Sequence, residues 1–273
     1  MLCLLATCEE RVRDMTSKLD RAEALATSSS DGLVVHRAAS RAEMGARAAQ
    51  DIAARLRTLL QTRAQLRMIF AAAPSQADML AQLVAAPGID WSRITAFHMD
   101  EYIGLAPDHP QRFAAWLDAH IFSAVPFGAV HRLQPEPEPE AAARHYADRL
   151  AEAPIDLICM GIGVNGHIAF NDPPVADFAD PLDVKVVALD QVCRQQQVDD
   201  QCFPDLGAVP THALTLTVPR LMRAESLFCV VPGAHKRDAV MRTLAGPIDT
   251  ACPASILRRH PDCNLYLDNE SAP

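Results

Sequence analysis

A glycine-rich segment, "GIGVNGHIAFNDPP" at residues 161–174, contains a histidine and an aspartate five residues apart. The imidazole of His167 titrates near neutral pH, so it can move protons under physiological conditions. Asp172 can fold back across the loop to orient the ring, and Asn165 can hold the ring or donate to a substrate oxygen. The segment predicts a proton-transfer site, and the alternative is a histidine that only caps the loop.

The same glycines have the G-x-G-x-x-G spacing of a dinucleotide-binding turn. Asp190, 24 residues after Gly166, stands near the position of a ribose-binding acid. Such a turn requires a helix that starts at the third glycine and continues for several turns. Here three prolines follow within residues 167–183 and leave room for about one turn of helix. The proton-transfer interpretation is therefore favoured over the dinucleotide site.

A second acidic segment, "FHMDEYIGL" at residues 97–105, has Asp100 and Glu101 side by side at the end of an apolar run. Neighbouring residues of a strand point to opposite faces, so one carboxylate can enter a site while the other has a structural role. A carboxylate beside the histidine loop is suited to remove a proton from carbon. Solvated loop acids are the alternative. His98, Asp100 and Glu101 lack the spacing of a recognised metal site, so no metal is predicted.

Apolar runs alternate with amphipathic segments along the chain. Strands are expected at residues 33–38, 66–73, 94–99, 155–163, 184–189, 212–218, 226–233 and 264–268. Helices are expected at residues 40–65, beginning at a serine N-cap, and at 75–86, 111–122, 141–153 and about 236–244. This alternation predicts an α/β fold, a single doubly wound, mostly parallel sheet with helices on both faces. Ligands bind such sheets at the carboxyl ends of the strands, where both motifs lie.

Composition limits the class of protein. The chain has 273 residues with a net charge of −9, and residues 33–273 are expected to form one α/β domain after a helical or flexible extension, residues 1–32, with a break at "SSSDG". Nucleic acid is not expected as a partner, because such proteins need a basic face. No apolar run approaches the ~18 residues of a membrane span. The eight cysteines form no C-x-x-C pair, which favours reduced thiols in the cytoplasm. A homo-oligomer is possible.

The two motifs together resemble the glucosamine-6-phosphate deaminase/isomerase family, whose relatives include the 6-phosphogluconolactonases. The resemblance extends through "VPTHALTLTVPRLMRAE", "VVPGAHKRDAV" and "CPASILRRHPD" and covers roughly residues 33–268. Tyr102 and Ile168 make the two motifs more similar to the deaminase branch, because the lactonase branch has arginine and threonine at these two positions. The resemblance implies a Rossmann-like fold of the deaminase/lactonase type.

The resemblance also implies a reaction. In that family the residue matching Asp100 abstracts the C2 proton of the open-chain sugar and returns it at C1. The residue matching His167 assists ring opening, and an acid five residues on, here Asp172, orients it. Asn165 stands where the family commonly has aspartate, so any acid role at that place is lost. The products are a ketose phosphate and ammonia, and no cofactor is required.

The expected sugar-phosphate site departs from the family pattern. The family has a Gly-Gly-Thr-type loop, a lysine and an arginine around the phosphate, whereas this chain reads "AAAPSQADML" in that loop. Ser75 and Gln76 are the candidate donors there, and Lys236 matches the lysine. Arg194 is the first choice for the arginine and Gln197 the second. The change predicts an altered phosphate geometry or a different sugar.

The glycine loop has a further expected role. Backbone N–H groups at Gly161 and Gly163 can stabilise the negative charge that develops on the substrate during enolisation. Two other functions remain open beside the deaminase. One is a sugar lactone hydrolase in which His167 activates water, and the other is a non-catalytic sugar-phosphate-sensing module.

Overall fold

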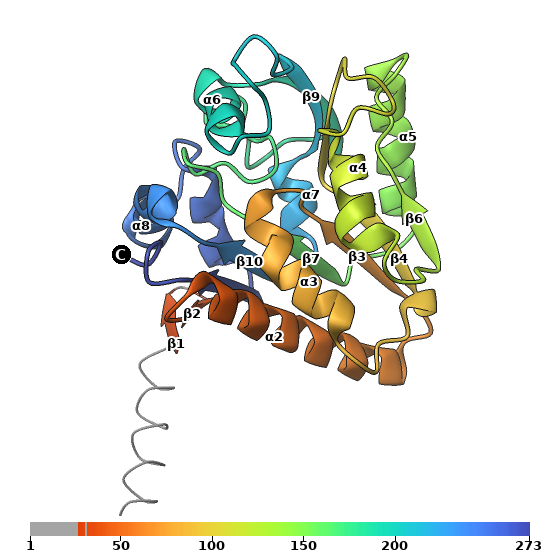
Figure 1. Cartoon of the computed structure of the whole chain (residues 1–273), viewed down its shortest axis with the longest axis vertical. Coiled ribbons are helices and arrows are strands. Elements are labelled where there is room, and N and C mark those ends of the chain that lie inside the picture. Colours follow the sequence, from red (N-terminus) through yellow and green to blue (C-terminus); the bar gives the residue numbers. More distant parts are fainter. Residues whose placement is uncertain (1–26, 31) are drawn as a thin grey trace, which may run out of the picture.

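The main sheet has eight strands, β1 (Thr27–Ser30), β2 (Leu33–Arg37), β3 (Leu66–Phe70), β4 (Ile94–His98), β6 (Ala129–His131), β7 (Leu157–Met160), β10 (Ser226–Val231) and β11 (Cys263–Leu267). Their order in the sheet is β1-β2-β11-β10-β7-β3-β4-β6 (Figure 1). Every neighbouring pair is parallel except β1 and β2. All residues of β7 and β10 are buried, as expected for central parallel strands covered on both faces.

The computed structural model describes residues 27–30 and 32–273. The extension predicted at residues 1–32 therefore lies mostly outside the described residues. The flexible break predicted at residues 28–32 is wrong for its first part, because Thr27–Ser30 form β1 and pair antiparallel with β2.

Helices cover both faces of the main sheet, as predicted. The helices of the described residues are α2 (Arg41–Thr62), α3 (Ala77–Ala85), α4 (Phe113–Leu117) with a π-helical turn (Asp118–Phe122), α5 (Pro139–Ala151), α6 (Gln191–Asp199), α7 (Val218–Met222) and α8 (Arg237–Ala245). Of these, α6 packs against the smaller sheet described below. Short 3-10 turns lie at Pro74–Gln76, Trp91–Arg93, Ala234–Lys236 and Pro253–Arg259. The predicted cap of α2 is confirmed, because the Ser40 hydroxyl accepts the N–H of Glu43 at 3.2 Å. Along residues 27–30 and 32–273, no helix has the length and apolar character that a membrane span requires.

An apolar core lies on each face of the main sheet. The helices α2 and α3 lie side by side (Figure 1) and pack on one face together with the π-helical turn. The helices α5, α7 and α8 pack on the opposite face. The doubly wound arrangement brings the chain segments that follow β3, β4 and β7 to one edge of the sheet, where the site is expected.

A second, smaller sheet stands beside this edge. It consists of β5 (Asp100–Tyr102), β9 (His212–Leu216) and β8 (Val184–Ala188), all antiparallel. The predicted strands at residues 184–189 and 212–218 thus form, but they do not join the parallel sheet. This small sheet has its own apolar cluster, which includes Tyr102, Phe170 and Phe203. The sheet places Asp100 at the carboxyl edge of the main sheet.

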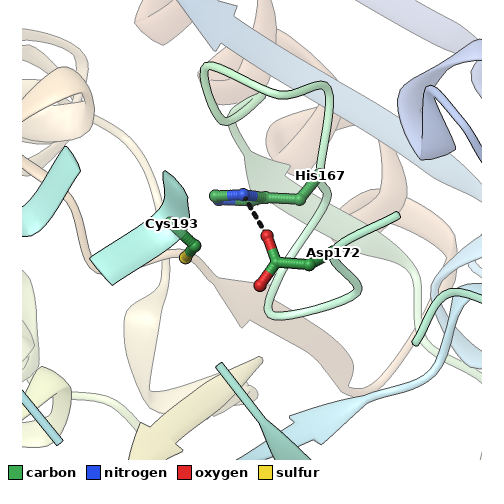
Figure 2. Close-up of side chains that lie close together, drawn as sticks. All are labelled: His167, Asp172 and Cys193. Carbon is green, nitrogen blue, oxygen red and sulfur yellow. Dashed lines mark ion pairs between the residues drawn. The ribbon is translucent and has the colours of Figure 1, made fainter. Parts of the chain in front are cut away.

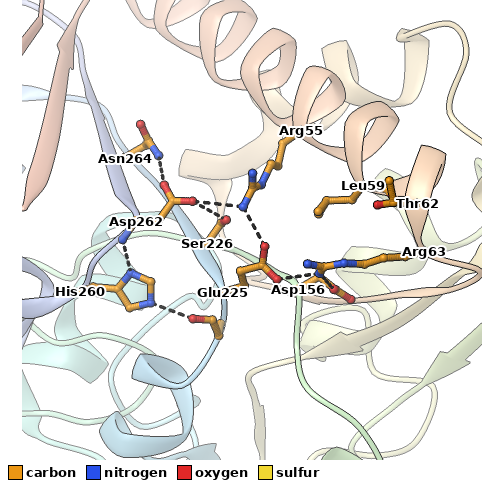
Figure 3. Close-up of polar contacts among 11 residues, drawn as sticks. Arg55, Leu59, Thr62, Arg63, Asp156, Glu225, Ser226, His260, Asp262 and Asn264 are labelled. Atoms are coloured by element: carbon orange, nitrogen blue, oxygen red, sulfur yellow. Dashed lines mark hydrogen bonds and ion pairs between the residues drawn. The ribbon is translucent and has the colours of Figure 1, made fainter.

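The amino edge of the main sheet is closed by a polar network (Figure 3). Arg55 of α2 and Arg63, directly after this helix, contact Glu225 at 2.9 and 2.6 Å, and Arg63 also contacts Asp156. These side chains are partly exposed, so each ion pair stabilises the fold by no more than about 1 kcal/mol. The network connects α2 to the starts of β7 and β10 and has a structural role.

Candidate active site

A cavity that opens to solvent lies at the carboxyl edge of the main sheet. Its walls come from the segments after β3 and β7, from β5, and from α6 and the turn before α8. Six of the ten predicted site residues line it: Ser75, Asp100, Gly161, Gly163, His167 and Lys236. The fold therefore brings together residues that lie up to 161 positions apart in the chain.

The glycines of the loop leave room for the ring of His167. A Cβ on Gly163 would lie 2.1 to 2.3 Å from ring atoms of His167, so only glycine lets the imidazole rest on the loop. Gly166 has a φ of +87°, a left-handed conformation that side chains rarely adopt. The N–H of Gly163 donates to the carbonyl of His167 at 2.9 Å, so this glycine is already bonded within the loop. Of the two predicted backbone donors, Gly163 is therefore not free to bind a substrate.

The dinucleotide interpretation is excluded by the path of the chain after the loop. No helix begins at Gly166, and the next feature is a single bridge between Ile168 and Asn171. Asp190 does not face a ribose site. Its side chain caps α6 by accepting the N–H of Val192 at 3.2 Å.

The histidine lies against a buried carboxylate (Figure 2). Nδ1 of His167 is 2.9 Å from Oδ1 of Asp172, although its N–H does not point directly at that oxygen. Asn165 donates its side-chain amide to the same oxygen at 2.9 Å, and its side-chain oxygen accepts the backbone N–H of His167 at 3.0 Å. The N–H of Asp190 reaches Oδ2 at 3.3 Å. Asn165 is therefore a positioning residue that holds both partners.

These contacts determine the charge of Asp172. Complete burial by itself raises the pKa of this carboxyl. The contacts with His167, Asn165 and the N–H of Asp190 outweigh burial and bring the pKa below its ordinary value. Asp172 is thus an ionised partner that fixes the orientation of the ring.

The two adjacent acids take different roles. Asp100 lines the cavity at 7 % exposure, and burial, followed by the charge of Glu101, raises its pKa well above the ordinary value. The carboxylate of Glu101 is fully buried and accepts the N–H groups of Tyr102, Phe113 and Ala114, each at 3.0 Å. Glu101 connects β5 to the start of α4. Asp100 is left as the carboxyl group that faces a ligand.

His98 supports the backbone of Asp100. Its Nε2 accepts the N–H of Leu133 at 2.7 Å, and its Nδ1 lies 2.9 Å from the carbonyl of Asp100. Burial lowers the pKa of His98 to about 3, so the ring is neutral. Both ring nitrogens of His98 therefore contact backbone groups.

Lys236 is the cation of the cavity. It is 4 % exposed, and burial lowers its pKa to about 8, while the charge of Asp200 acts in the opposite direction. Within the described part of the chain, its ammonium has no hydrogen-bond or ion-pair partner. Ser75 lines the same cavity in the turn before α3. A buried cation without a partner, beside the N-terminal turn of a helix, suits an anionic ligand group.

Two predicted binding residues are corrected, because neither lines the cavity. Gln76 is fully buried and donates its amide to the carbonyl of Val230 and to the hydroxyl of Ser75, both at 3.1 Å. Arg194 turns its guanidinium to the loop after α6, where it donates to three carbonyls at 2.6 to 3.1 Å, those of Leu206, Val209 and Pro210. Both side chains satisfy backbone carbonyls that no local pattern reveals.

The second choice for the missing arginine, Gln197, does line the cavity, together with Gln196 and Asp200 of the same segment. The latter two were missed in the sequence. Their spacing of four residues places them on one helix face, and Gln196 accepts the N–H of Val164 at 3.0 Å. This helical spacing is the signal by which they could have been found.

Comparison with known proteins agrees with this geometry. The family model described as glucosamine-6-phosphate isomerases/6-phosphogluconolactonase matches residues 39–265. Proteins named glucosamine-6-phosphate deaminase from Exiguobacterium sp. and Listeria innocua are each 35 % identical, over 192 and 195 residues. These matches cover 70 % and 71 % of this chain, and 74 % and 81 % of the relatives.

Solved structures show the same architecture. The structure of a monomeric glucosamine-6-phosphate deaminase superposes with a TM-score of 0.78 at 26 % identity, covering 87 % of this chain and 98 % of the other. A 6-phosphogluconolactonase from Thermotoga maritima has a TM-score of 0.71 at 18 % identity, covering 87 % and 100 %. The lactonase comparison supports the fold alone.

Proposed function

Since the chain belongs to the family of glucosamine-6-phosphate isomerases and 6-phosphogluconolactonases, we propose that it deaminates an amino-sugar phosphate of the glucosamine 6-phosphate type. The products are a ketose phosphate and ammonia. The observation that carries this proposal is one cavity that contains a buried carboxyl, an oriented histidine and an unpaired lysine. The curated relatives named above are deaminases, which supports the same reaction.

His167 opens the sugar ring. Its Nδ1 faces Asp172, so Nε2 is the nitrogen available to the cavity. Nε2 takes the proton of the anomeric hydroxyl and delivers a proton to the ring oxygen, which yields the open-chain aldehyde. The ionised Asp172 stabilises the imidazolium that forms between these two steps.

Asp100 moves the proton between two carbons. Its carboxylate removes the C2 proton, and the electron pair forms the C1–C2 double bond. The C1 oxygen takes a proton from the ammonium group of the substrate, which gives the enolamine. Burial makes Asp100 a stronger base than a solvated aspartate, and the ammonium group of the substrate favours its ionised form. Asp100 then returns the proton to C1, which leaves an imine at C2. Water adds to the imine, and ammonia leaves.

Lys236 and Ser75 hold the phosphate end of the substrate in this proposal. The charge of Asp200 in the same cavity opposes a dianion, so we infer that the phosphate geometry differs from a glycine cradle. In the same proposal, residues 33–273 form the catalytic domain. The protein acts in the cytoplasm, and its partner is a small sugar phosphate.

A substrate panel tests the function. Each amino sugar is supplied with and without its phosphate, and 6-phosphogluconolactone is included. Ammonia and ketose phosphate from glucosamine 6-phosphate, lost in Asp100→Asn, are the expected result. Hydrolysis of the lactone without ammonia release from any amino sugar contradicts the proposal and favours the hydrolase.

A further inference from the structure

A buried thiol that the deamination mechanism does not use lies beside the catalytic imidazole. Cys193 of α6 is fully buried. Its Sγ, a ring nitrogen of His167 and a carboxylate oxygen of Asp172 all lie within 4.8 Å of one another. Figure 2 shows these side chains converging from α6 and from the glycine loop. We propose that the three residues form a site for a thiophilic divalent cation of the Zn²⁺ class, which inhibits the enzyme reversibly.

The donor atoms are the set that this class of cation prefers. Zn²⁺ in proteins is bound by cysteine sulfur, histidine nitrogen and carboxylate oxygen. The cation displaces the thiol proton to solvent and forms bonds to Sγ, to Nδ1 and to the carboxylate. Thiolate and carboxylate together balance two positive charges, so the occupied site is neutral, as a buried site requires.

The ring nitrogen is available for this bond. Nδ1 of His167 is buried and lacks an aligned hydrogen bond within residues 27–30 and 32–273. When the ring carries its proton on Nε2, the lone pair of Nδ1 points to the carboxylate side. Asn165 and the N–H of Asp190 already hold the carboxylate of Asp172, as outer groups do in established metal sites.

The spacing requires only a small movement. Metal bonds of about 2.0 to 2.3 Å place neighbouring donor atoms roughly 3.5 Å apart. Nδ1 of His167 and Oδ1 of Asp172, now 2.9 Å apart, must therefore separate by about 0.6 Å. Sγ of Cys193, within 4.8 Å of both partners, must approach by up to about 1.3 Å. Cys193 is the buried residue of α6 and packs in the apolar cluster of the small sheet, so its Sγ must approach by rotation of the side chain and not by a shift of the helix.

The enzyme cannot turn over its substrate while the cation is bound. A cation on Nδ1 replaces the contact between His167 and Asp172, and it prevents the imidazole from accepting a proton as it does in ring opening. This inhibition rests on the proposed function, whereas binding of the cation does not.

Binding is measured with Co²⁺ alone, because a cobalt–thiolate bond has a charge-transfer absorption that free Co²⁺ lacks. The wild-type protein should gain this band with one equivalent of Co²⁺ and lose it when Zn²⁺ is added. Cys193→Ser should lack the band. Cys202→Ser is the matched control, because Cys202 is a half-buried thiol outside the cluster, and it should keep the band.

A wild-type protein without the band, or a Cys193→Ser protein with the wild-type band, overturns the site. If Cys193→Ser does not fold, Asp172→Asn replaces it and should weaken Co²⁺ binding at least tenfold; unchanged affinity overturns the site. Equimolar Zn²⁺ should inhibit the wild-type enzyme, with recovery on chelation, and equal inhibition of Cys193→Ser contradicts the proposal. Absence of turnover on all amino sugars contradicts only the proposed function, since absorption needs no substrate.

Discussion

Replacing Lys236 by methionine should make the protein more stable and a poorer enzyme. The ammonium is buried without a partner among the described residues, and its pKa falls from 10.5 to about 8. Each tenfold change in a protonation equilibrium corresponds to about 1.4 kcal/mol, so this charge costs the folded state about 3 kcal/mol. Methionine keeps the length and apolar stem of the side chain and removes the charge. Lys236→Met should therefore raise the free energy of unfolding at pH 7 by up to about 3 kcal/mol.

The pH dependence of the stability gain in Lys236→Met shows whether the charge of Lys236 is its cause. The folded-state pKa lies below that of the unfolded chain, so the unfolded chain binds the proton more tightly. The free-energy cost of burying the charged Lys236 has its full value below about pH 8. It falls as pH rises through the folded-state pKa and is close to zero near pH 10.5. Urea unfolding at pH 7 and at pH 10 measures the difference between wild type and Lys236→Met. The stability gain should be large at pH 7 and small at pH 10.

Steady-state kinetics complete the test. KM for the phosphorylated amino sugar should rise at least tenfold in Lys236→Met, since a charge-assisted hydrogen bond contributes about 1.5 to 3 kcal/mol. KM of the wild-type enzyme should also rise above about pH 8, where Lys236 loses its charge. Lys236→Arg, the matched control, keeps a charge at both pH values. A variant that is less stable than wild type at pH 7, or equally stabilised at both pH values, refutes the reasoning.

Three further substitutions test the positions of other side chains. Gly163→Ala puts a methyl group within 2.3 Å of the ring of His167 and should lower kcat about 100-fold or more with little change in KM, so an unchanged kcat would contradict the loop geometry. Glu101→Gln replaces one accepting oxygen by an amide donor opposite a buried N–H and should lower the free energy of unfolding by about 2 kcal/mol; equal stability in urea unfolding would show that the carboxylate is not needed there. Arg194→Met should lower the unfolding midpoint and leave KM within about twofold of wild type, and a tenfold rise in KM would restore Arg194 as a substrate-binding residue.

Local patterns were sufficient to predict much of this protein. The parallel strands are short apolar runs bounded by turns, and the catalytic loop holds its histidine, asparagine and aspartate within eight residues. Interactions at such short range depend mainly on the local backbone. Asp100 and Glu101 divide between cavity and helix start because neighbouring strand residues point to opposite faces.

Long-range contacts explain what could not be predicted. The period of a strand is the same in a parallel and an antiparallel sheet, so residues 184–188 and 212–216 did not reveal their separate sheet. Arg194 and Gln76 are long side chains whose backbone carbonyl partners lie 12 to 154 positions away. The thiol of Cys193 meets the histidine loop only because α6 packs against it.

The most direct test of the central claim follows the hydrogen at C2. Glucosamine 6-phosphate deuterated at C2 is converted by the wild-type enzyme, and the ketose phosphate is analysed by NMR together with the ammonia released. Proton transfer by Asp100 predicts deuterium at C1 of the product, one ammonia for each ketose phosphate, and no product from Asp100→Asn that still binds the substrate. Product formed by Asp100→Asn at the wild-type rate, or no ammonia from the wild-type enzyme, would contradict the account.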